Sequence, residues 1–338
     1  MPAEWDPHER TIMGWPCRRE LWGERFEQAK RDYAEVANAI AAFEPVLMVA
    51  NPGNDAAEAR AGCGAGVEIA ELPLDDSWLR DSGPIYVRDA KGGRYAVHFR
   101  FNAWGEKFLP YDKDAAVGAL VAERLGDGVI PAPIVLEGGS IYVDGAGTLI
   151  TTEECLLNPN RNPELSREQI EDVLRGLLGI ERIVWLGQGL VEDRDTDGHV
   201  DLIAAFCEPG RVLLQTVDED NPNFARCLEN HARLEAAGLE VTELPFLPYA
   251  TVAGERVAAG YLNFYLCNGA VIVPVAGAET DEAALSIIGA AYPGRELIGV
   301  PGVVLAYGGG GPHCITQQVP ATDSNRPTAE AAAAGGGR

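Results

Sequence analysis

The chain has 338 residues, 46% of them hydrophobic, and its 51 acidic against 27 basic side chains give a formal net charge of −24. This is the composition of a globular protein with an ordinary core, and the negative charge opposes binding to nucleic acid or to anionic membrane surfaces. The N-terminus lacks the features of a signal peptide, and no stretch approaches about 18 uninterrupted apolar residues, so we expect a soluble, cytoplasmic protein.

The seven cysteines occur at irregular spacings and never as CxxC, which argues against a disulfide framework and against a thiolate zinc site. No histidine has the HExxH spacing or another paired-ligand spacing, so the sequence predicts no metal site. We expect most of the cysteines to be reduced thiols, with one a candidate for reactivity.

Apolar spacing predicts the elements in chain order. A helix at 166–178 is also marked by a capping box of Ser166 with Gln169 and by Gly179 at its end. Many short strands with fewer helices predict an α/β fold, without naming its topology. No linker interrupts the chain, so we expect one domain over residues 1–327 and a disordered, Ala- and Gly-rich tail at 328–338. The predicted elements are a helix at 24–43; strands at 45–50, 84–88, 95–99, 133–136 and 148–151; the helix at 166–178; strands at 182–186, 200–206 and 211–216; a helix at 224–237; strands at 257–265 and 270–275; a helix at 279–291; and a strand at 302–306.

The segment LPLDDSWLRDSGPIYV is the first of four that could carry chemistry. It places three aspartates, among them Asp76 and Asp81, around Trp78. Carboxylates accept the N–H groups of a planar cation and an indole stacks on its face, so the segment suits a guanidinium-like ligand. The alternative is a solvated acidic loop in which Asp81 pairs with a nearby arginine.

Two further segments contribute an acid and a histidine. In VLEGGSIYV, Glu137 ends a strand-like run before two glycines and is either a hairpin residue or an inward-facing acid. In DTDGHVD, His199 and Asp201 lie two apart at the start of an apolar run, and on a strand they would project to the same side. A chance pair at the protein surface is the alternative for the histidine and aspartate.

The fourth segment, GGGGPHCITQQ, places the run Gly308–Gly311 shortly before Cys314. Glycines permit backbone conformations and close approaches that other residues forbid, so the loop could present Cys314 at the mouth of a site. A flexible turn before a buried, inert cysteine is the alternative. The segment lacks the Gly-Lys-Ser/Thr ending of a phosphate-binding loop, so we exclude nucleotide binding.

Together these segments supply a cysteine nucleophile, a histidine and several carboxylates, which suits attack on a cationic carbon. A thiolate can add to such a carbon, and an imidazole can protonate the departing nitrogen. An acyl-transfer enzyme would need donors to an oxyanion, which surrounding carboxylates would oppose.

The chain resembles the agmatine deiminase branch of the guanidine-modifying (pentein) superfamily, which also contains arginine and peptidylarginine deiminases. The resemblance implies a single-domain, five-bladed α/β propeller of ββαβ-type units with the site at its centre, although no internal repeat is visible in the residues. It covers nearly the whole chain, through the blocks MPAEWDPHERTIMGWP, DDSWLRDSGP, FNAWGEKF with YDKD, LEGGSIYVDGAGTLITTEECLLNPNRNP, DTDGHVD, YLNFYLCNGAVIVP and GGGGPHCITQQVP.

By motif, the resemblance implies that Cys314 is the nucleophile and His199 the general acid and base. Asp81 and Asp201 match the carboxylates that hold the guanidinium nitrogens, and Glu137 matches the glutamate that orients the histidine. An imidazolium beside the thiol would lower its pKa from about 8.5 and nearby carboxylates would raise it, so the sequence leaves the net effect open.

Three further residues are implied to line the substrate pocket: Trp78 as an aromatic wall, with Asp76 and Asn263. One departure from the family pattern is Gly311 followed by Pro312, where an asparagine and an aliphatic residue are expected; it would alter the shape of the loop without removing a catalytic group.

The implied activity is that of a hydrolase acting on C–N bonds of linear amidines. Agmatine would give N-carbamoylputrescine and ammonia through a cysteine S-alkylthiouronium intermediate, a step of putrescine and polyamine biosynthesis, with no metal or organic cofactor. Alternatives are a deiminase of free arginine or C-terminal peptidyl-arginine, an amidinotransferase, and a noncatalytic guanidino-binding protein. The expected partner is a small cationic substrate, with no nucleic acid or membrane, and the resemblance is consistent with a homodimer.

Overall fold

A computed structural model describes residues 1–322 of the chain, and the predicted tail at 328–338 lies outside the described residues. The strands are β1 (His8–Gly14), β2 (Val46–Ala50), β3 (Val67–Glu71), β4 (Ile85–Arg88), β5 (Arg94–Arg100), β6 (Gly128–Val135), β7 (Ile141–Val143), β8 (Thr148–Thr152), β9 (Arg182–Leu186), β10 (Ala204–Glu208), β11 (Arg211–Gln215), β12 (Glu240–Leu244), β13 (Tyr249–Val252), β14 (Glu255–Ala258), β15 (Tyr265–Cys267), β16 (Ala270–Val275), β17 (Glu296–Pro301) and β18 (Thr316–Pro320).

Helices connect many of these strands. They are α1 (Arg19–Trp22), α2 (Phe26–Ala41), α3 (Asn54–Gly62), α4 (Leu79–Ser82), α5 (Ala103–Glu106), α6 (Asp112–Leu125), α7 (Glu153–Leu156), α8 (Arg167–Leu178), α9 (Phe224–Ala236), α10 (Asp281–Ala291) and α11 (Val303–Tyr307), with short 3₁₀ turns η1 (Gly23–Arg25), η2 (Gly138–Ser140) and η3 (Val200–Leu202).

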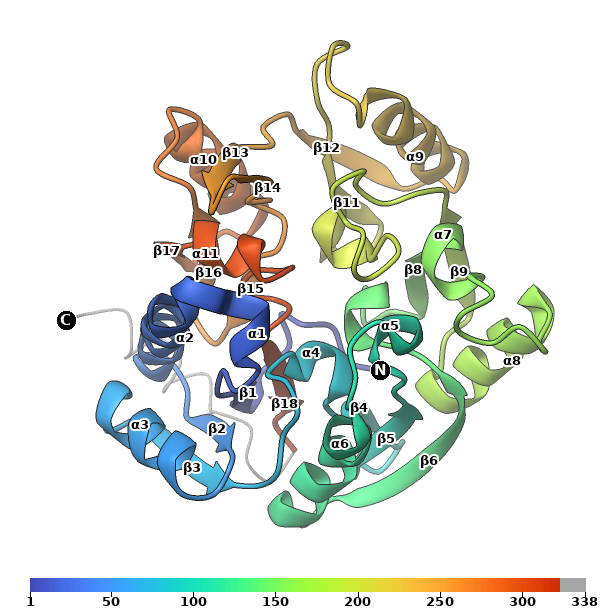
Figure 1. The fold of residues 1–338 in the computed structure, drawn as a ribbon. Coiled ribbons are helices and arrows are strands. Elements are labelled where there is room, and N and C mark those ends of the chain that lie inside the picture. The colour runs from blue at the N-terminus through green and yellow to red at the C-terminus, as the bar shows by residue number, and fades with distance from the viewer. Residues whose placement is uncertain (323–338) are drawn as a thin grey trace.

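One three-stranded pattern recurs around the molecule. In the sheets β4–β5–β6, β7–β8–β9, β10–β11–β12 and β15–β16–β17, the first strand pairs antiparallel with the second, and the second pairs parallel with the third across a helical connection. The strands β18, β1 and β2 repeat this pattern, with β3 added at the edge. The predicted α/β fold is therefore confirmed, and its sheets are arranged around a common centre (Figure 1).

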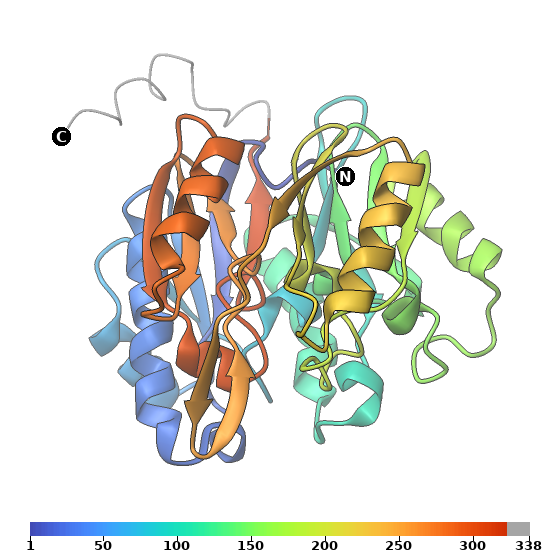
Figure 2. The ribbon, with the colours of Figure 1, turned by 90° about the horizontal axis from the view of Figure 1, so that it is seen from above.

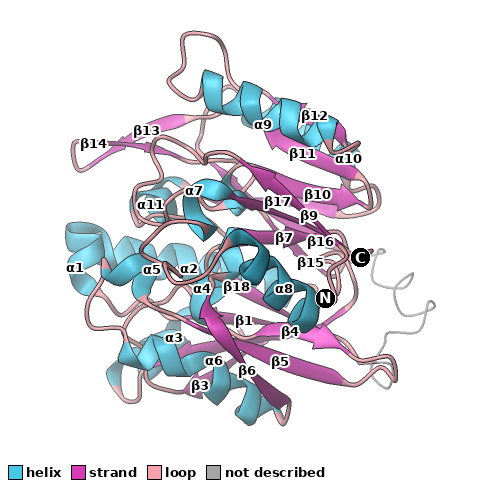
Figure 3. Cartoon of the chain, turned by 90° about the vertical axis from the view of Figure 1, so that its right-hand side faces the viewer, coloured by secondary structure: helices cyan, strands magenta, loops and turns pink. Residues whose placement is uncertain are grey.

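Pairing between the two ends of the described chain completes this arrangement. β18 pairs antiparallel with β1, so the loop that precedes β18 is carried to the centre beside the N-terminal residues. Helices α8, α9 and α10 lie on the outer side of the sheets (Figure 2), while the hairpin of β13 and β14 extends away from them (Figure 3). The outer helices leave the centre to the strand ends and short connections, whose side chains can form a functional site there.

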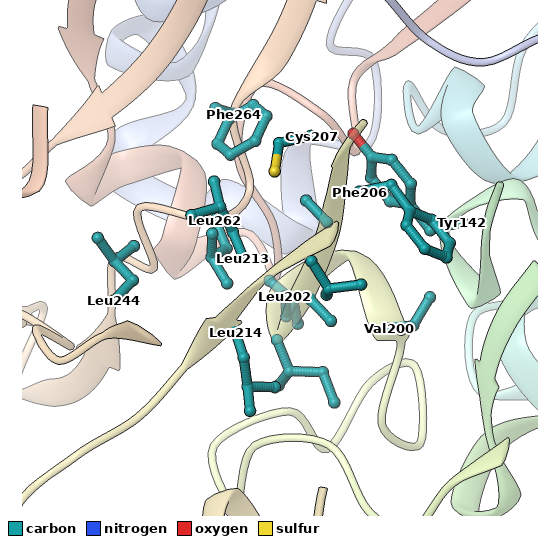
Figure 4. Packing of buried hydrophobic residues seen from close by; sticks show 14 of the residues in the cluster. Tyr142, Val200, Leu202, Phe206, Cys207, Leu213, Leu214, Leu244, Leu262 and Phe264 are labelled. Atoms are coloured by element: carbon teal, nitrogen blue, oxygen red, sulfur yellow. The ribbon is translucent and has the colours of Figure 1, made fainter. Parts of the chain in front are cut away.

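The core is built from apolar residues that the strands and the inner helix faces bury. The largest cluster joins three sheets, β7–β8–β9, β10–β11–β12 and β15–β16–β17, and Figure 4 shows part of it, including Phe206 of β10, Leu213 of β11 and the buried Phe264. Because this cluster spans three sheets, burial of apolar surface fixes their relative positions.

The four helices predicted from periodicity are confirmed as α2, α8, α9 and α10. The capping box at Ser166 is formed, and Gly179 ends α8 in the left-handed conformation. No helix among residues 1–322 is long and apolar enough to cross a lipid bilayer.

Three strand predictions need correction. The run 302–306 is not a strand, because residues 303–306 lie in helix α11, which packs on α2. A short apolar run does not by itself distinguish a strand from a buried helix. Residues 200–202 form the turn η3, and β10 starts only at Ala204. Of the run 257–265, residues 257–258 end β14 and Tyr265 starts β15, while residues 259–264 lie in neither strand.

Candidate active site

Cys314 lies in the loop between α11 and β18, and its side chain is buried. Asn263 holds the backbone around it: the N–H of Cys314 donates to Asn263 Oδ1 at 3.3 Å, and the N–H of His313 donates to the Asn263 carbonyl at 3.0 Å. Gly311 permits this approach, because a Cβ there would lie 2.8 Å from Asn263 Oδ1. Asn263 therefore supports the loop that carries Cys314.

The thiol of Cys314 faces a carboxylate. Its Sγ donates a hydrogen bond to Asp201 Oδ2 at 3.4 Å. Burial, together with the negative charges of Asp201 and Asp81, raises the pKa of the Cys314 thiol well above its ordinary value. The sequence left open whether a nearby imidazolium or the carboxylates dominate the pKa of this thiol. In the structure burial and the carboxylates dominate, so the thiol is protonated in the absence of substrate.

A buried network of charges holds Asp201. His313 Nδ1 lies 2.8 Å from Asp201 Oδ2, and its Nε2 lies 2.8 Å from Glu4 Oε2. Burial and the Arg80 charge lower the pKa of His313, but the two carboxylates raise it more, so the ring carries a positive charge. Burial raises the pKa of Asp201, but hydrogen bonding and attraction to His313 outweigh it, and Asp201 is an anion.

Asp81 is held from two sides. Trp104 Nε1 donates to Asp81 Oδ2, and the backbone N–H of Gly139 donates to Oδ1, both at 2.9 Å. Burial raises the pKa of Asp81 to about 6, with His199 opposing the rise and Asp201 adding to it. Gly139 allows these groups to approach, because a Cβ there would lie 2.6 Å from His199 Nδ1. Asp81 is therefore an anion at neutral pH that protonates in mild acid.

The segment that presents Trp104 adopts an unusual backbone. Ala103, Trp104 and Glu106 have φ values of 52°, 56° and 62°, and the N–H of Gly105 donates to Asn102 Oδ1 at 2.9 Å. Non-glycine residues adopt positive φ rarely and at a cost, and such positions concentrate at functional sites. The strained turn directs the indole N–H toward Asp81.

His199 is surrounded by acids. Its Nδ1 lies 3.8 Å from Asp81 Oδ1 and 4.0 Å from Asp201 Oδ1, while its Nε2 lies 4.0 Å from Glu137 Oε2. Burial lowers the pKa of His199, but the charge of Asp81, followed by Cys155 and Asp201, raises it well above the ordinary value. The ring is therefore an imidazolium that can give up a proton.

Glu137 faces inward, as one of the two sequence interpretations expected. It follows β6 at the start of η2, and its Oε1 accepts a hydrogen bond from Arg161 Nε at 2.6 Å, with both side chains fully buried. Arg161 in turn donates to the Thr196 carbonyl and pairs with Asp197 at 2.9 Å. This ion pair leaves Glu137 Oε2 directed at the imidazole.

A narrow pocket reaches Cys314 from the protein surface. Trp78 forms part of its wall and stacks on Trp22, with ring centroids 5.9 Å apart. Asp76 pairs with Arg18 at 2.9 Å, and burial raises the pKa of Asp76 to about 6 despite that partner. No lysine or arginine is among the described residues that line the pocket, which are Leu21, Asp76, Trp78, Asp81, Trp104, Phe108, Asp195, Thr196, Gly308, Gly309 and Cys314.

The structure brings the predicted site residues together. Cys314, Asp81, Trp78 and Asp76 line the pocket, whereas Asn263 lies behind the loop that carries Cys314. Of the other three, His199 adjoins Asp81, Asp201 adjoins Cys314, and Glu137 adjoins His199. The expectation that His199 and Asp201 share a strand is wrong, because Asp201 lies in η3; both still reach the site since the turn brings Asp201 Oδ1 within 4.0 Å of His199 Nδ1.

Sequence reasoning assigned no role to several groups that hold this site. Trp104 and Glu4 lie within segments quoted above for their resemblance, and His313 directly precedes Cys314. Arg161 and Cys155 both lie in the same quoted block as Glu137, LEGGSIYVDGAGTLITTEECLLNPNRNP. The available signal was a charged or aromatic residue inside a matching block, but its contact partners come from distant segments.

A buried thiol, two carboxylates that can accept N–H groups, and an imidazolium beside them form the site of a cysteine-dependent enzyme for planar cations. Residues 1–320 match the model of the Porphyromonas-type peptidyl-arginine deiminase family, and the chain belongs to that family.

Named relatives are similar over nearly the whole chain. An agmatine deiminase of Stutzerimonas stutzeri is 42% identical over 351 residues, covering 95% of both chains. The structure of the agmatine deiminase of Enterococcus faecalis superposes with a TM-score of 0.91 at 34% identity, again covering 95% of both chains. An amidinotransferase from Microseira wollei, at 13% identity and a TM-score of 0.58 with coverage of 97% and 98%, shares the fold alone.

Proposed function

We propose that the protein is a hydrolytic deiminase that converts agmatine and water to N-carbamoylputrescine and ammonia. The observation that carries the proposal is the placement of Cys314 Sγ at 3.4 Å from Asp201, in a pocket that Asp81 also lines. Two carboxylates can hold guanidinium nitrogens while the sulfur faces the central carbon. Relatives that are named agmatine deiminase and match 95% of the chain support the same substrate.

The charge of the pocket supports an amine substrate over an arginine. Asp76, Asp81 and Asp195 line it, and no lysine or arginine is among its described lining residues. Arg194 and Arg256 line an adjoining cavity that shares Asp195 and Gly309 with this pocket. A substrate with two positive charges is therefore favoured over one that carries an α-carboxylate.

In the proposed mechanism, Asp81 and Asp201 bind the guanidinium. The positive charge of the substrate offsets the negative charges that raise the pKa of Cys314, so this pKa falls when the substrate binds. The thiol proton is released, and the thiolate adds to the guanidinium carbon. His199 then gives its proton to the leaving nitrogen, ammonia departs, and an S-alkylthiouronium remains.

Hydrolysis completes the cycle. Neutral His199 takes a proton from a water molecule that attacks the same carbon, and the carbon–sulfur bond breaks. The ureido product leaves and Cys314 regains its proton. Glu137, directed at Nε2 from 4.0 Å, keeps the ring oriented and favours its charged form.

The deciding experiment measures ammonia and ureido product from agmatine, free arginine and a peptide ending in arginine, with Cys314→Ala as the control. We expect turnover of agmatine alone and a loss of at least about 1,000-fold in the variant. Intact turnover in Cys314→Ala would exclude the mechanism, and release from arginine or the peptide would change the substrate.

Two outcomes would point to the other functions. Formation of a new guanidino compound only when an amine acceptor is added would indicate an amidinotransferase. Agmatine binding without any ammonia would indicate a noncatalytic guanidino-binding protein.

We further infer that the protein acts in the cytoplasm. All seven cysteines are free thiols, as in a reducing compartment. A role in putrescine biosynthesis follows if agmatine is the substrate. The homodimer stays a prediction, which light scattering would test.

A further inference from the structure

Cys155, His199 and Glu137 form a cluster that the proposed mechanism uses only in part. Cys155 lies in α7, Glu137 precedes η2, and His199 precedes η3. One ligand atom from each residue lies within 4.8 Å of the others. The spacing of these residues along the chain gave no indication of a metal site, because the fold brings them together from three separate segments.

We propose that this cluster binds a zinc ion, which withdraws His199 from proton transfer and inhibits the enzyme. A thiolate, an imidazole and a carboxylate are the three ligand types that Zn²⁺ prefers, and a water molecule or hydroxide completes a tetrahedral site. The class of ligand is therefore a borderline-soft divalent cation, with Zn²⁺ as its representative.

Unpartnered polar atoms support a ligand at this position. Glu137, Cys155 and His199 are each at most 1% exposed, yet neither Glu137 Oε2 nor either ring nitrogen of His199 has a hydrogen bond of ordinary geometry to a described residue. Buried polar groups are usually paired, so such a gap calls for an explanation. A cation between Oε2 and Nε2, which lie 4.0 Å apart, would satisfy both.

The surroundings of the cluster suit such an ion. Glu137 Oε1 is already fixed by Arg161, which leaves Oε2 as the metal ligand. Arg161 is itself compensated by Asp197 at 2.9 Å. Zn²⁺ with one thiolate and one carboxylate is formally neutral, so binding adds no net charge to the buried site.

Binding releases protons and breaks no other bond. The Cys155 thiol gives its proton to solvent, the imidazolium loses the proton on the nitrogen that becomes the ligand, and the metal takes both lone pairs. With the metal on Nε2, the ring keeps a proton only on Nδ1, the nitrogen that faces Asp81 and Asp201. Because the metal-bound ring can no longer become an imidazolium, it is a much weaker acid toward the leaving nitrogen. Inhibition therefore follows from occupation of His199, and a chelator should reverse it.

The test titrates Zn²⁺ into chelator-treated Cys314→Ser protein by isothermal titration calorimetry, because this variant removes the nucleophile as a competing ligand. We expect one site per chain that is weakened on the order of 100-fold or more when Cys155→Ser is added, since the loss of even an outer partner costs roughly 10- to 100-fold in metal affinity. Replacement of the metal by Co²⁺ should give a thiolate charge-transfer band that disappears in the same double variant.

Two controls separate the cluster from other thiols. Cys63→Ser in the Cys314→Ser background removes a partly exposed cysteine outside the cluster and should leave the affinity unchanged. Glu137→Gln keeps the shape of the side chain and should weaken binding even if the Cys155 variant folds poorly, as judged by circular dichroism.

Equal affinity with and without Cys155 would overturn the proposal, as would the disappearance of the wild-type site in Cys314→Ser, which would put the metal on the nucleophile. These binding results do not depend on the proposed function. Inhibition does rest on it: Zn²⁺ should inhibit agmatine turnover by the wild-type protein until EDTA is added, and full activity with the site occupied would overturn the inhibitory role.

Discussion

At the scale of single residues, the site is organised by carboxylates whose charge is controlled in opposite directions. Asp201 is kept anionic by the positively charged His313, whereas burial raises the pKa of Asp81 to about 6. Only one of the two proposed guanidinium partners therefore titrates near neutral pH, and its protonation decides whether the substrate cation can be held from both sides.

This difference predicts the acid side of the pH profile. Asp81 is charged above about pH 6 and neutral below it, and a neutral carboxyl group grips a guanidinium poorly. We expect kcat/KM for agmatine to fall about tenfold for each pH unit below about 6, because kcat/KM reports groups of the free enzyme. Initial rates between pH 5 and 8 check this, and a profile that stays flat down to pH 5 would contradict it.

Trp104→Phe gives a matched test of the same carboxylate. The change keeps an aromatic ring but removes the Nε1–H donor, which lies 2.9 Å from Asp81 Oδ2 and lowers the pKa of Asp81. The acid limb should therefore move to higher pH. At pH 7 kcat/KM should fall by roughly 10- to 100-fold, since a hydrogen bond to a charged group contributes about 1.5–3 kcal/mol. An unchanged limb would show that the bond does not tune Asp81.

At the scale of elements, the turn η2 connects Asp81 to His199. Gly139 donates its backbone N–H to Asp81, and its α-carbon faces the imidazole without a side chain between them. The turn lies shortly after β6 and can approach both side chains because it has glycine at this position. This close approach accounts for the glycines that follow Glu137.

Gly139→Ala should therefore abolish activity. Its Cβ would lie 2.6 Å from His199 Nδ1 and 2.9 Å from Asp81 Oδ1, so one or both of these proposed catalytic groups must move. A displacement of about 1 Å at such groups costs on the order of 100-fold in rate, so kcat should fall at least that much.

Gly176→Ala is the control for this substitution. Gly176 lies inside α8, a Cβ there meets nothing within 4 Å, and alanine should raise the free energy of unfolding by roughly 0.5–1 kcal/mol without changing kcat. Normal activity of Gly139→Ala would show that the centre tolerates displacement of its charges.

Elements with strong local signals could be predicted from the sequence, and those defined by distant partners could not. The helix α8 carries its own apolar face, capping box and terminal glycine. In contrast, β1 and β18 are paired with each other across the whole chain, and α11 is helical where its composition suggested a strand. Local pattern does not encode which distant segment a strand or short helix will meet.

The residues of the candidate site also divide into those that the sequence could predict and those that it could not. The sequence could propose Cys314, His199, Asp81, Asp201 and Glu137 as site residues because they stand in recognisable motifs, and the fold brings them together. Their supports could not, because each is a tertiary contact: Trp104 reaches Asp81 through a strained turn, and Arg161 reaches Glu137 across a separate loop. A motif identifies candidate reacting groups, whereas the pKa values of these groups and the distances between them depend on the folded chain.

At the scale of the whole molecule, Glu4 links segments that lie far apart in the sequence. Its Oε2 lies 2.8 Å from His313 Nε2 and 3.2 Å from an Arg80 nitrogen, and its Oε1 accepts the N–H of Leu266 at 2.9 Å. Four segments therefore meet at one buried carboxylate: the N-terminal segment, the Asp81 segment, β15 and the loop that carries Cys314. These contacts make Glu4 a positioning residue for the centre.

This junction predicts how stability depends on pH. Burial raises the pKa of Glu4, but the positive charges of His313 and Arg80 outweigh it and hold the pKa at about 2 in the folded protein, below the ordinary 4.5. A group with a lowered pKa in the folded state stabilises the fold above its unfolded pKa, and this contribution is lost as the pH falls through the folded value.

The free energy of unfolding of the wild type should therefore exceed that of Glu4→Gln by about 3 kcal/mol above pH 4.5, with the difference shrinking between pH 4.5 and about 2. Urea unfolding followed by circular dichroism at pH 6, 4 and 3 measures the difference directly. The glutamine keeps the size and an acceptor of the side chain but not its charge, so the comparison isolates the ion pairs. A difference that is constant from pH 6 to 3 would mean that Glu4 contributes through packing alone, because a buried charge with positive partners must lose its contribution as it becomes protonated.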